Sequence, residues 1–401
     1  MSKSYPRISN IFLALPCIVL EAMGSPASIG PTNLANVVSI DGSVHEGGGQ
    51  LLRVALVFSS ILNKPVHINN IRLHRKSPGL QAEHIASVEL ARNMCKADVR
   101  HMVKDSRQLF FAPRTNLTHD EYDADTKGHG SVTLLMQVGL PLAMFSSGIT
   151  QFSLKGSTNT FNAPSLDFYT NAWDPLTFKF FGTNMEIRDI RRGFFPKGRG
   201  HVYLEVYPVQ YLRPIDLTEF EEIVTTWGRA VCTPDIKIDT VDIMGDIVEE
   251  YLLTHHREAY EKIDILREQL RPYEAHGNGS AIYLFAETTS RAILSAGLTV
   301  QKYRGFNETA VQVAQEFSNL LKTKVCVDDY MQDQLIVLMA LAKGKSRIKT
   351  GNITLHTKTA IHVAETMSRA KFNIVDNKDG THIIECDGIG FENKLIDRPY
   401  V

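Results

Sequence analysis

Hydrophobic and polar residues follow one another along this chain in a rhythm that predicts strands and helices in turn. Over 50–62 the apolar residues recur at helical spacing, which predicts a helix. The run 66–71 alternates residue by residue, as half-buried strands do, and 38–41 could end an earlier strand. The folded chain is therefore predicted to begin with a strand, a helix and a second strand.

The same rhythm returns farther along the N-terminal half. We expect helices at about 81–95 and 132–145, each after a polar loop that contains glycine, and strands at 109–112, 152–154 and 201–206. Such repeated segments predict a large α/β domain built from repeated strand and helix units, although the units share little sequence similarity.

Charged residues become frequent in the third quarter of the chain. Alternating charges over 240–269 predict a long helix with a solvated face. We interpret 217–319 as a smaller α/β domain, inserted into a large domain made of 38–216 and 320–401.

Near the C-terminus, Asp328 has the side chain of a helix N-cap. The helix behind it would carry Tyr330, Asp333 and Gln334 along one polar stripe, next to an apolar one.

A histidine farther on is predicted to lie at the mouth of another helix. We interpret 346–355 as a pair of strands around Gly351, followed by a helix over about 359–370. His356 would then lie at the N-terminus of that helix, where the helix dipole disfavours an imidazolium and attracts a phosphate.

Composition and charge restrict the class of protein. The chain has 401 residues, 43% of them hydrophobic and 22% charged, which is ordinary for a soluble globular protein with a large core. With 43 Lys and Arg against 44 Asp and Glu, a polyanionic partner would be bound at a local patch. The 5 cysteines contain no Cys-x-x-Cys pair, which favours reduced thiols in an intracellular compartment and predicts neither disulfides nor a zinc site.

Residues 1–37 differ from the rest of the chain. Lys3 and Arg7 precede a short apolar run, 11–20, in the manner of a weak signal peptide. The run is too short to cross a membrane and Pro16 interrupts it. We interpret this segment as a dispensable or disordered extension, with an export or organellar address as the second interpretation, and we predict no membrane partner.

The stretch 41–53 contains the first candidate site. Gly47, Gly48 and Gly49 separate the carboxylate of Glu46 from a helical run, and a helix N-terminus behind glycines suggests an anion site. A tight turn between a strand and a helix is the ordinary alternative.

Each candidate taken singly has such an ordinary explanation. Glu46 could cap a helix, Arg53 could be a surface charge, Asp333 could lie on an exposed helix face and His356 could be structural. A carboxylate suited to a divalent metal, arginines suited to phosphate, glycine loops and a histidine at a helix mouth together suggest phosphoryl or nucleotidyl transfer.

A set of motifs in a fixed order resembles the RNA 3'-terminal phosphate cyclases, and most of all those of animals. The resemblance covers about 38–390. It rests on Asp-Gly-Ser-x-x-Glu-Gly-Gly-Gly-Gln (41–50), Arg-x-x-Arg (72–75), Ser-Pro-Gly-Leu (77–80), Leu-Leu-Met-Gln-Val (134–138), Arg-Gly-Phe-Phe-Pro-Lys-Gly (192–198), Tyr-Met-Gln-Asp-Gln (330–334), Ser-Arg-Ile-Lys-Thr-Gly (346–351) and Leu-His-Thr (355–357).

The resemblance implies a fold of three repeated α/β units, related to the enolpyruvyl transferases, with one smaller inserted α/β domain. It also implies an ATP-dependent ligase that converts an RNA 3'-terminal phosphate to a 2',3'-cyclic phosphate. The reaction would pass through a covalent adduct between His356 and AMP, and then through an RNA-adenylate.

Site residues follow from the resemblance position by position. Glu46 would bind Mg²⁺ or Mn²⁺, and His356 would be the nucleophile. Three arginines would bind phosphate, and a further set would bind ATP together with His356. The phosphate-binding residues are Arg53, Arg72 and Arg75, and the ATP-binding residues are Gln137, Pro164, Tyr330, Asp333 and Gln334.

Relatives of this kind suggest a location in the nucleus, in the nucleoplasm, with the cytoplasm as a second compartment, and RNA with a 3'-phosphate end as the partner. Whether the chain forms a homodimer stays open. Several residues depart from the family pattern and put rate and substrate preference in doubt: His74, His129, Arg199, His201 and His276.

Two rival interpretations remain. One is a noncatalytic relative that acts in ribosome assembly, which would lack the nucleophile. The other is a metabolic enzyme of the enolpyruvyl transferase type, which would leave His356 and the stripe from Tyr330 to Gln334 unexplained.

Overall fold

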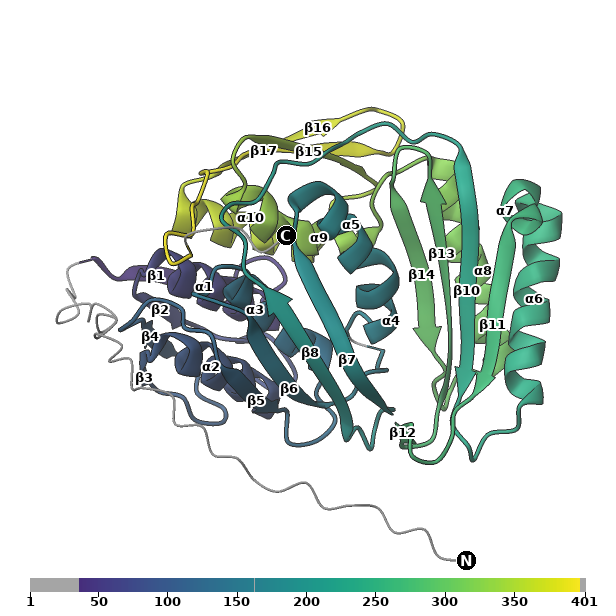
Figure 1. Cartoon of the computed structure of the whole chain (residues 1–401), viewed down its shortest axis with the longest axis horizontal. Helices are drawn as coiled ribbons and strands as arrows, with labels where there is room; N and C mark the ends of the chain where they lie inside the picture. The colour runs from purple at the N-terminus through teal and green to yellow at the C-terminus, as the bar shows by residue number, and fades with distance from the viewer. Residues whose placement is uncertain (1–35, 162, 397–401) are drawn as a thin grey trace, which may run out of the picture.

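The computed structural model describes residues 36–161 and 163–396, so nearly all of the predicted N-terminal extension, 1–37, lies outside the described residues. Four sheets and the helices between them make up this part of the chain (Figure 1). The predicted α/β class is confirmed. None of the described helices combines the length and the apolar character that a bilayer span requires.

The first sheet contains the strands predicted at the start of the chain. Its order is β1-β2-β4-β3, and the parallel strands β1 and β2 are joined through α1. The helix α2 follows β2 after a polar loop. The elements are β1 (Val38–Asp41), α1 (Gly49–Leu62), β2 (Val66–Asn69), α2 (Ala82–Cys95), β3 (Asp98–Arg100) and β4 (Leu109–Ala112).

The second sheet has the order β12-β7-β8-β6-β5, and α3 connects the parallel strands β5 and β6. After β6 the chain forms a short helix, one turn of π-helix and a further helix. The elements are β5 (Glu121–Asp125), α3 (Val132–Met144), β6 (Thr150–Gly156), α4 (Leu166–Phe168), the π-helix (Tyr169–Trp173), α5 (Asp174–Phe181), β7 (Asn184–Gly193), β8 (Gly200–Tyr207) and β12 (Ala275–His276).

Three strands from the C-terminal part of the chain and the short β9 from its middle form a third sheet, of order β16-β17-β15-β9, at the top of Figure 1. Two helices, α9 and α10, lie next to it. The elements are β9 (Asp216–Leu217), α9 (Asp329–Leu341), β15 (Lys345–Thr350), α10 (Leu355–Ser368), β16 (Lys371–Asp376) and β17 (His382–Asp387).

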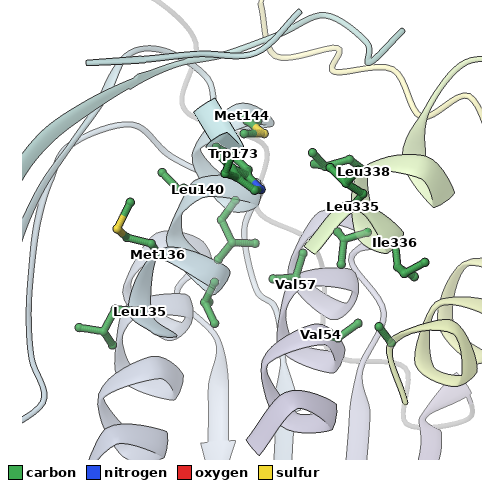
Figure 2. Close-up of a cluster of buried hydrophobic side chains, with 14 of the residues drawn as sticks. Val54, Val57, Leu135, Met136, Leu140, Met144, Trp173, Leu335, Ile336 and Leu338 are labelled. Carbon is green, nitrogen blue, oxygen red and sulfur yellow. The ribbon is translucent and has the colours of Figure 1, made fainter. Parts of the chain in front are cut away.

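Side chains from three of these helices meet in one buried apolar cluster. Figure 2 shows aliphatic side chains of α1, α3 and α9 that belong to this cluster, with Trp173 of the π-helix among them. Twelve residues of α1, from Gln50 to Ile61, are buried, because the helix has neighbours on almost every side. The labelled members of the cluster are Val54, Val57, Leu135, Met136, Leu140, Met144, Trp173, Leu335, Ile336 and Leu338.

A fourth sheet, of order β11-β10-β13-β14, lies at the right of Figure 1. One face packs against α6 and α8 and forms a second apolar cluster between Ile223 and Val325. The other face adds residues such as Tyr283 and Phe285 to the first cluster. The elements are β10 (Ile223–Cys232), α6 (Asp239–His255), α7 (Arg257–Glu261), β11 (Ile263–Gln269), β13 (Ser280–Thr288), β14 (Ile293–Thr299) and α8 (Phe306–Thr323).

The prediction of one helix over 240–269 is wrong at its C-terminal end. Helix α6 stops at His255, and β11 then pairs in parallel with β10. Ile265 is buried between the exposed Asp264 and Leu266, so the period here is two residues and the charges belong to the solvent side of a strand.

The predicted strand pair around Gly351 is also wrong. Strand β15 pairs with β17 and β9, and Gly351 lies in the loop behind it. Thr354 caps the next helix, since its Oγ1 accepts from the backbone N–H of Thr357 at 3.0 Å. Helix α10 therefore begins at Leu355, and His356 belongs to its first turn rather than preceding it.

Candidate functional site

The glycine loop brings Glu46 against the start of α10. The backbone N–H of Glu46 donates to Thr359 Oγ1 at 3.2 Å, and Arg75 forms an ion pair with the Glu46 carboxylate. A Cβ added to Gly48 would collide with this carboxylate, so a larger residue there would displace the Glu46 side chain from its present position. The loop thus connects residues that lie 313 positions apart.

Arg53 projects from α1 into the interior instead of lying on the surface. Only 7% of the residue is exposed, and its Nε donates to Gln137 Oε1 of α3 at 2.5 Å. Burial lowers the pKa of the guanidinium, while the negative charges of Glu83 and Asp333 raise it. The ordinary explanation of Arg53 as a surface charge is therefore wrong.

His84 is a buried neighbour of Arg53 that the sequence did not single out. Its Nδ1 accepts from the backbone N–H of Gln81 at 2.9 Å. A Cβ on Gly49 would lie 2.6 Å from both Arg53 Nη1 and His84 Nε2, so this glycine touches both groups. Burial, followed by the charges of Arg53 and Arg72, lowers the pKa of His84 to about 3. The only local signal was the pairing of Gln81 and His84 at the start of α2, which forms a capping box.

Asp333 and Gln334 of α9 line the same cavity as Arg53. Gln334 Nε2 donates to Asp333 Oδ1 at 2.7 Å, and Gln334 Oε1 accepts from the buried hydroxyl of Tyr169 at 3.0 Å. Burial raises the pKa of Asp333 to about 7, although Gln334 and the charge of Arg53 lower it. Asp333 is only 7% exposed, so the ordinary explanation that it lies on an exposed helix face is wrong. Arg53, Gln137, Asp333, Gln334 and Tyr169 line one small cavity.

His356 lies at the solvent side of this group, in the first turn of α10. Partial burial of the ring, followed by the positive charges of Arg53 and Arg75, lowers its pKa. The imidazole is therefore neutral at neutral pH and carries a free electron pair on one nitrogen. Arg72 acts electrostatically on Arg53 and His84, so all three predicted phosphate-binding arginines lie around the same centre.

Pro164 and Tyr330 lie at a separate hollow between α9 and the fourth sheet. The two neighbours of Pro164 line it together with Phe168 and Tyr330, whose rings are 6.1 Å apart. The Pro164 carbonyl accepts from Thr133 Oγ1 on α3 at 2.8 Å. Because α3 also carries Gln137, this helix connects the hollow with the cavity at Arg53.

The motif at 192–198 lies behind that hollow. Arg192 forms two hydrogen bonds to the buried carboxylate of Asp167, at 2.6 and 2.8 Å. The backbone of the motif pairs with β12 on one side and with Asn159 on the other. It therefore ties the segment around Pro164 to β12, which lies in the connection between β11 and β13 of the fourth sheet.

Four of the residues that depart from the family pattern lie beside this motif or on neighbouring strands, namely His129, Arg199, His201 and His276, whereas His74 lies in the loop between β2 and α2. The His129 ring lies 5.5 Å from that of Phe195, and His201 Nε2 lies 3.0 Å from Ser153 Oγ. Arg199 has a φ of 58°, so it occupies a left-handed position that usually favours glycine.

Glu46 is the described residue best suited to a divalent cation. Its Oε2 is buried and has no hydrogen-bond partner, while Arg75 pairs with Oε1. No cluster of three or more His, Cys, Asp and Glu side chains suited to a metal occurs within the described ranges. A hard carboxylate oxygen without a partner fits Mg²⁺ or Mn²⁺, with substrate oxygens as further ligands.

Comparison with known proteins decides the family. The family model described as RNA 3'-terminal phosphate cyclase matches residues 44–374. The chain belongs to this family. It is 35% identical over 360 residues to the RNA 3'-terminal phosphate cyclase of Drosophila melanogaster, a match that covers 90% of this chain and 99% of that protein.

Other cyclases of the family are similar to a comparable degree. The probable RNA 3'-terminal phosphate cyclase of Dictyostelium discoideum is 34% identical, with 88% of this chain and 83% of that protein covered. The cyclase of Pyrobaculum aerophilum is 31% identical, with 88% and 99% covered. The resemblance in the sequence motifs is thus confirmed, and the chain is an enzyme of the cyclase type.

Proposed function

We propose that this cyclase converts the 3'-terminal phosphate of an RNA to a 2',3'-cyclic phosphate at the expense of ATP, through a covalent adduct of His356 with AMP. The observation that carries the proposal is the meeting of the glycine loop with α10. There the backbone of Glu46 is bonded to Thr359 at 3.2 Å, and the charges of Arg53 and Arg75 act on His356.

The first step uses the neutral imidazole. A ring nitrogen of His356 attacks the α-phosphorus of ATP, an N–P bond forms, and pyrophosphate leaves with the electrons of the broken P–O bond. The lowered pKa favours this step because it keeps the nucleophilic electron pair free at neutral pH. Arg53 and Arg75 stabilise the negative charge that develops on the phosphate oxygens.

Glu46 would hold Mg²⁺ or Mn²⁺ through the carboxylate oxygen that has no partner. The bound cation would neutralise the phosphates of ATP and assist the departure of pyrophosphate. The ion pair with Arg75 keeps the Glu46 carboxylate in the loop and ready for that ligand.

Two further steps complete the reaction. The RNA 3'-phosphate attacks the His356-bound AMP and forms a diphosphate-linked RNA-adenylate, which frees the imidazole. The adjacent ribose 2'-hydroxyl then attacks the activated phosphorus, loses its proton and expels AMP. This closure is favoured because the nucleophile and the phosphorus belong to one ribose.

The remaining predicted residues would orient the nucleotide. Tyr330 is 42% exposed, so its ring can stack on an adenine near Pro164. Asp333, Gln334 and Gln137 would hold polar groups of ATP and the phosphate chain. A nuclear location with a cytoplasmic pool, and assembly as a homodimer, belong to the same proposal.

The test is incubation with α-³²P-labelled ATP and Mg²⁺, followed by denaturing electrophoresis. We expect a labelled protein whose bond is labile in acid and stable in alkali, as a phosphoramidate is. His356→Asn should abolish the label. His255→Asn should keep it, because His255 is an exposed residue of α6 outside the site. An unlabelled wild-type protein would contradict the proposal and favour the noncatalytic alternative.

A second measurement concerns the substrate. RNA with a 3'-phosphate should compete for the protein far better than the same RNA with a 3'-hydroxyl, since the arginines around Glu46 would bind the terminal phosphate. Equal competition by both RNAs would contradict the proposed recognition of the terminal phosphate.

A further inference from the structure

Three side chains beside Glu46 form a patch that the proposed reaction does not use. His45 precedes Glu46 in the loop, and Lys358 and His362 lie one turn apart on α10. The rings of His45 and His362 meet edge to face, with their centroids 5.7 Å apart. We call these three residues the α10 patch.

The α10 patch is available to a ligand. Within 36–161 and 163–396, none of its three side chains forms a hydrogen bond or an ion pair, and His45 and Lys358 are exposed. Several other surface cations are paired, as Arg114 is with Asp98. Lys358 has no protein partner and lies beside the glycine loop, so it can bind an anion without first breaking an internal contact.

The charge around His45 is positive. Lys358 lies one turn before His362 on α10 and supplies a positive charge beside the two rings.

The α10 patch lies along one face of α10, next to the point where the glycine loop contacts the helix. Thr359, which accepts from the Glu46 backbone, follows Lys358 directly. Leu355, Lys358 and His362 share one face of the helix because residues three and four apart are neighbours. Leu355 is 56% exposed, so an apolar side chain, a cation and two rings form one strip that starts beside His356.

Single-stranded RNA is recognised by this kind of combination, in which cations follow the backbone while rings and apolar side chains contact the bases. We propose that the α10 patch, with Leu355, binds the nucleotide immediately 5' of the terminal one. Lys358 contacts its phosphate, and the rings of His45 and His362 contact its base. This inference rests on the proposed function, since it needs an RNA whose 3'-phosphate lies at His356.

The test compares the affinities of the protein for a longer and a shorter 3'-phosphorylated ligand, measured without ATP. The wild type and Lys358→Ala are titrated with a 3'-phosphorylated trinucleotide and with a nucleoside 3'-phosphate, which lacks the upstream nucleotide. For the trinucleotide we expect Lys358→Ala to weaken binding about fivefold. The slope of log Kd against log salt concentration should fall by about 0.7, the value for one phosphate of a single strand. Binding of the nucleoside 3'-phosphate should not change.

Matched variants control for charge and for folding. Lys302→Ala removes an exposed lysine of the turn after β14 and should leave both affinities unchanged. Lys358→Arg should restore most of the trinucleotide affinity. Removing the middle base of the trinucleotide should weaken binding to the wild type but have little effect on His362→Ala, where the contact with that base has already been reduced.

The outcomes separate this inference from the proposed function. If the wild type prefers 3'-phosphorylated RNA and Lys358→Ala binds the trinucleotide as well as the wild type does, only the patch assignment is overturned. Equal weakening for both ligands would also overturn it, because Lys358 would then act on the terminal phosphate. If the wild type binds neither ligand, the proposed substrate is wrong as well.

Discussion

The buried carboxylate of Asp333 provides a quantitative test of the site, because an ionised group without a close cationic partner should weaken the fold. Burial raises its pKa from the ordinary value of 3.8 to about 7. At about 1.4 kcal/mol for each pH unit, the folded protein disfavours the charged form by about 4 kcal/mol. The change Asp333→Asn removes the charge and keeps an oxygen that accepts from Gln334.

The sign follows from proton binding. The folded protein retains the Asp333 proton at pH values at which the unfolded chain has released it, so the free energy of unfolding falls as pH rises from about 4 to about 7. Of the roughly 4 kcal/mol by which deprotonation of Asp333 lowers the free energy of unfolding, about 1.7 kcal/mol has been lost by pH 5. The stability of Asp333→Asn relative to the wild type should therefore increase by about 2.5 kcal/mol between pH 5 and pH 8.

Urea unfolding followed by tryptophan fluorescence measures this difference, because Trp173 lines the same cavity as Asp333. Asp328→Asn is the matched control on the same helix. Burial raises the pKa of Asp328 to about 6. Its carboxylate, however, accepts from two backbone N–H groups of α9 and, at 2.9 and 2.7 Å, from the N–H and hydroxyl of Ser295.

An amide cannot accept all of these hydrogen bonds. Asp328→Asn should therefore lose hydrogen bonds worth about 1–3 kcal/mol at both pH values, and its stability relative to the wild type should rise less between pH 5 and pH 8 than that of Asp333→Asn, because the pKa of Asp328 is raised only to about 6. If Asp333→Asn differed from the wild type by the same amount at pH 5 and pH 8, Asp333 would not be a carboxylate that the fold disfavours in its charged form.

Two further changes test other parts of the site. Asp167→Asn should destabilise the protein by about 3–5 kcal/mol in the same assay, since it leaves the buried charge of Arg192 without its partner, and a loss below about 1 kcal/mol would contradict the burial of this pair. Glu46→Gln should raise the Mg²⁺ concentration needed for half-maximal labelling of the protein by α-³²P-ATP, and an unchanged requirement would show that Glu46 is not a metal ligand.

The spacing of apolar residues predicted a helix or strand correctly where the buried side of the element in the fold is the side that the spacing indicates. Helix α1 begins after Gly48, as the glycine loop and the apolar spacing predict, and Asp328 caps α9. The predictions failed where local pattern and tertiary partner disagree. The charges around Ile265 suit a helix or an exposed strand edge equally well, and β10 decides between them by pairing with the backbone.

The buried polar groups could not be placed from the sequence. Arg53 lies among apolar residues of α1, and nothing local indicates that Gln137, 84 positions away, accepts a hydrogen bond from it. His84 was missed for the same reason, because its contact with Arg53 depends on how α2 packs against α1. The family motifs in the sequence predicted which residues belong to the site. Only the packing of α1, α3 and α9 shows that Arg53, Gln137 and Asp333 line one cavity.

Arg53 and Asp333, which line this cavity, and His356, which lies outside it, share one electrostatic property. The pKa values of Arg53 and His356 are lowered and that of Asp333 is raised, so each of these groups is disfavoured in its charged form by its surroundings. A polyphosphate at the centre would supply the negative charge that Arg53 lacks, and it would favour protonation of Asp333 further. The free protein therefore keeps an arrangement that is costly alone and complementary to a bound anion, as expected where stability has been exchanged for binding. An anion that binds there should raise the thermal midpoint of the wild type more than that of Arg53→Gln, because only the wild type contains the uncompensated cation.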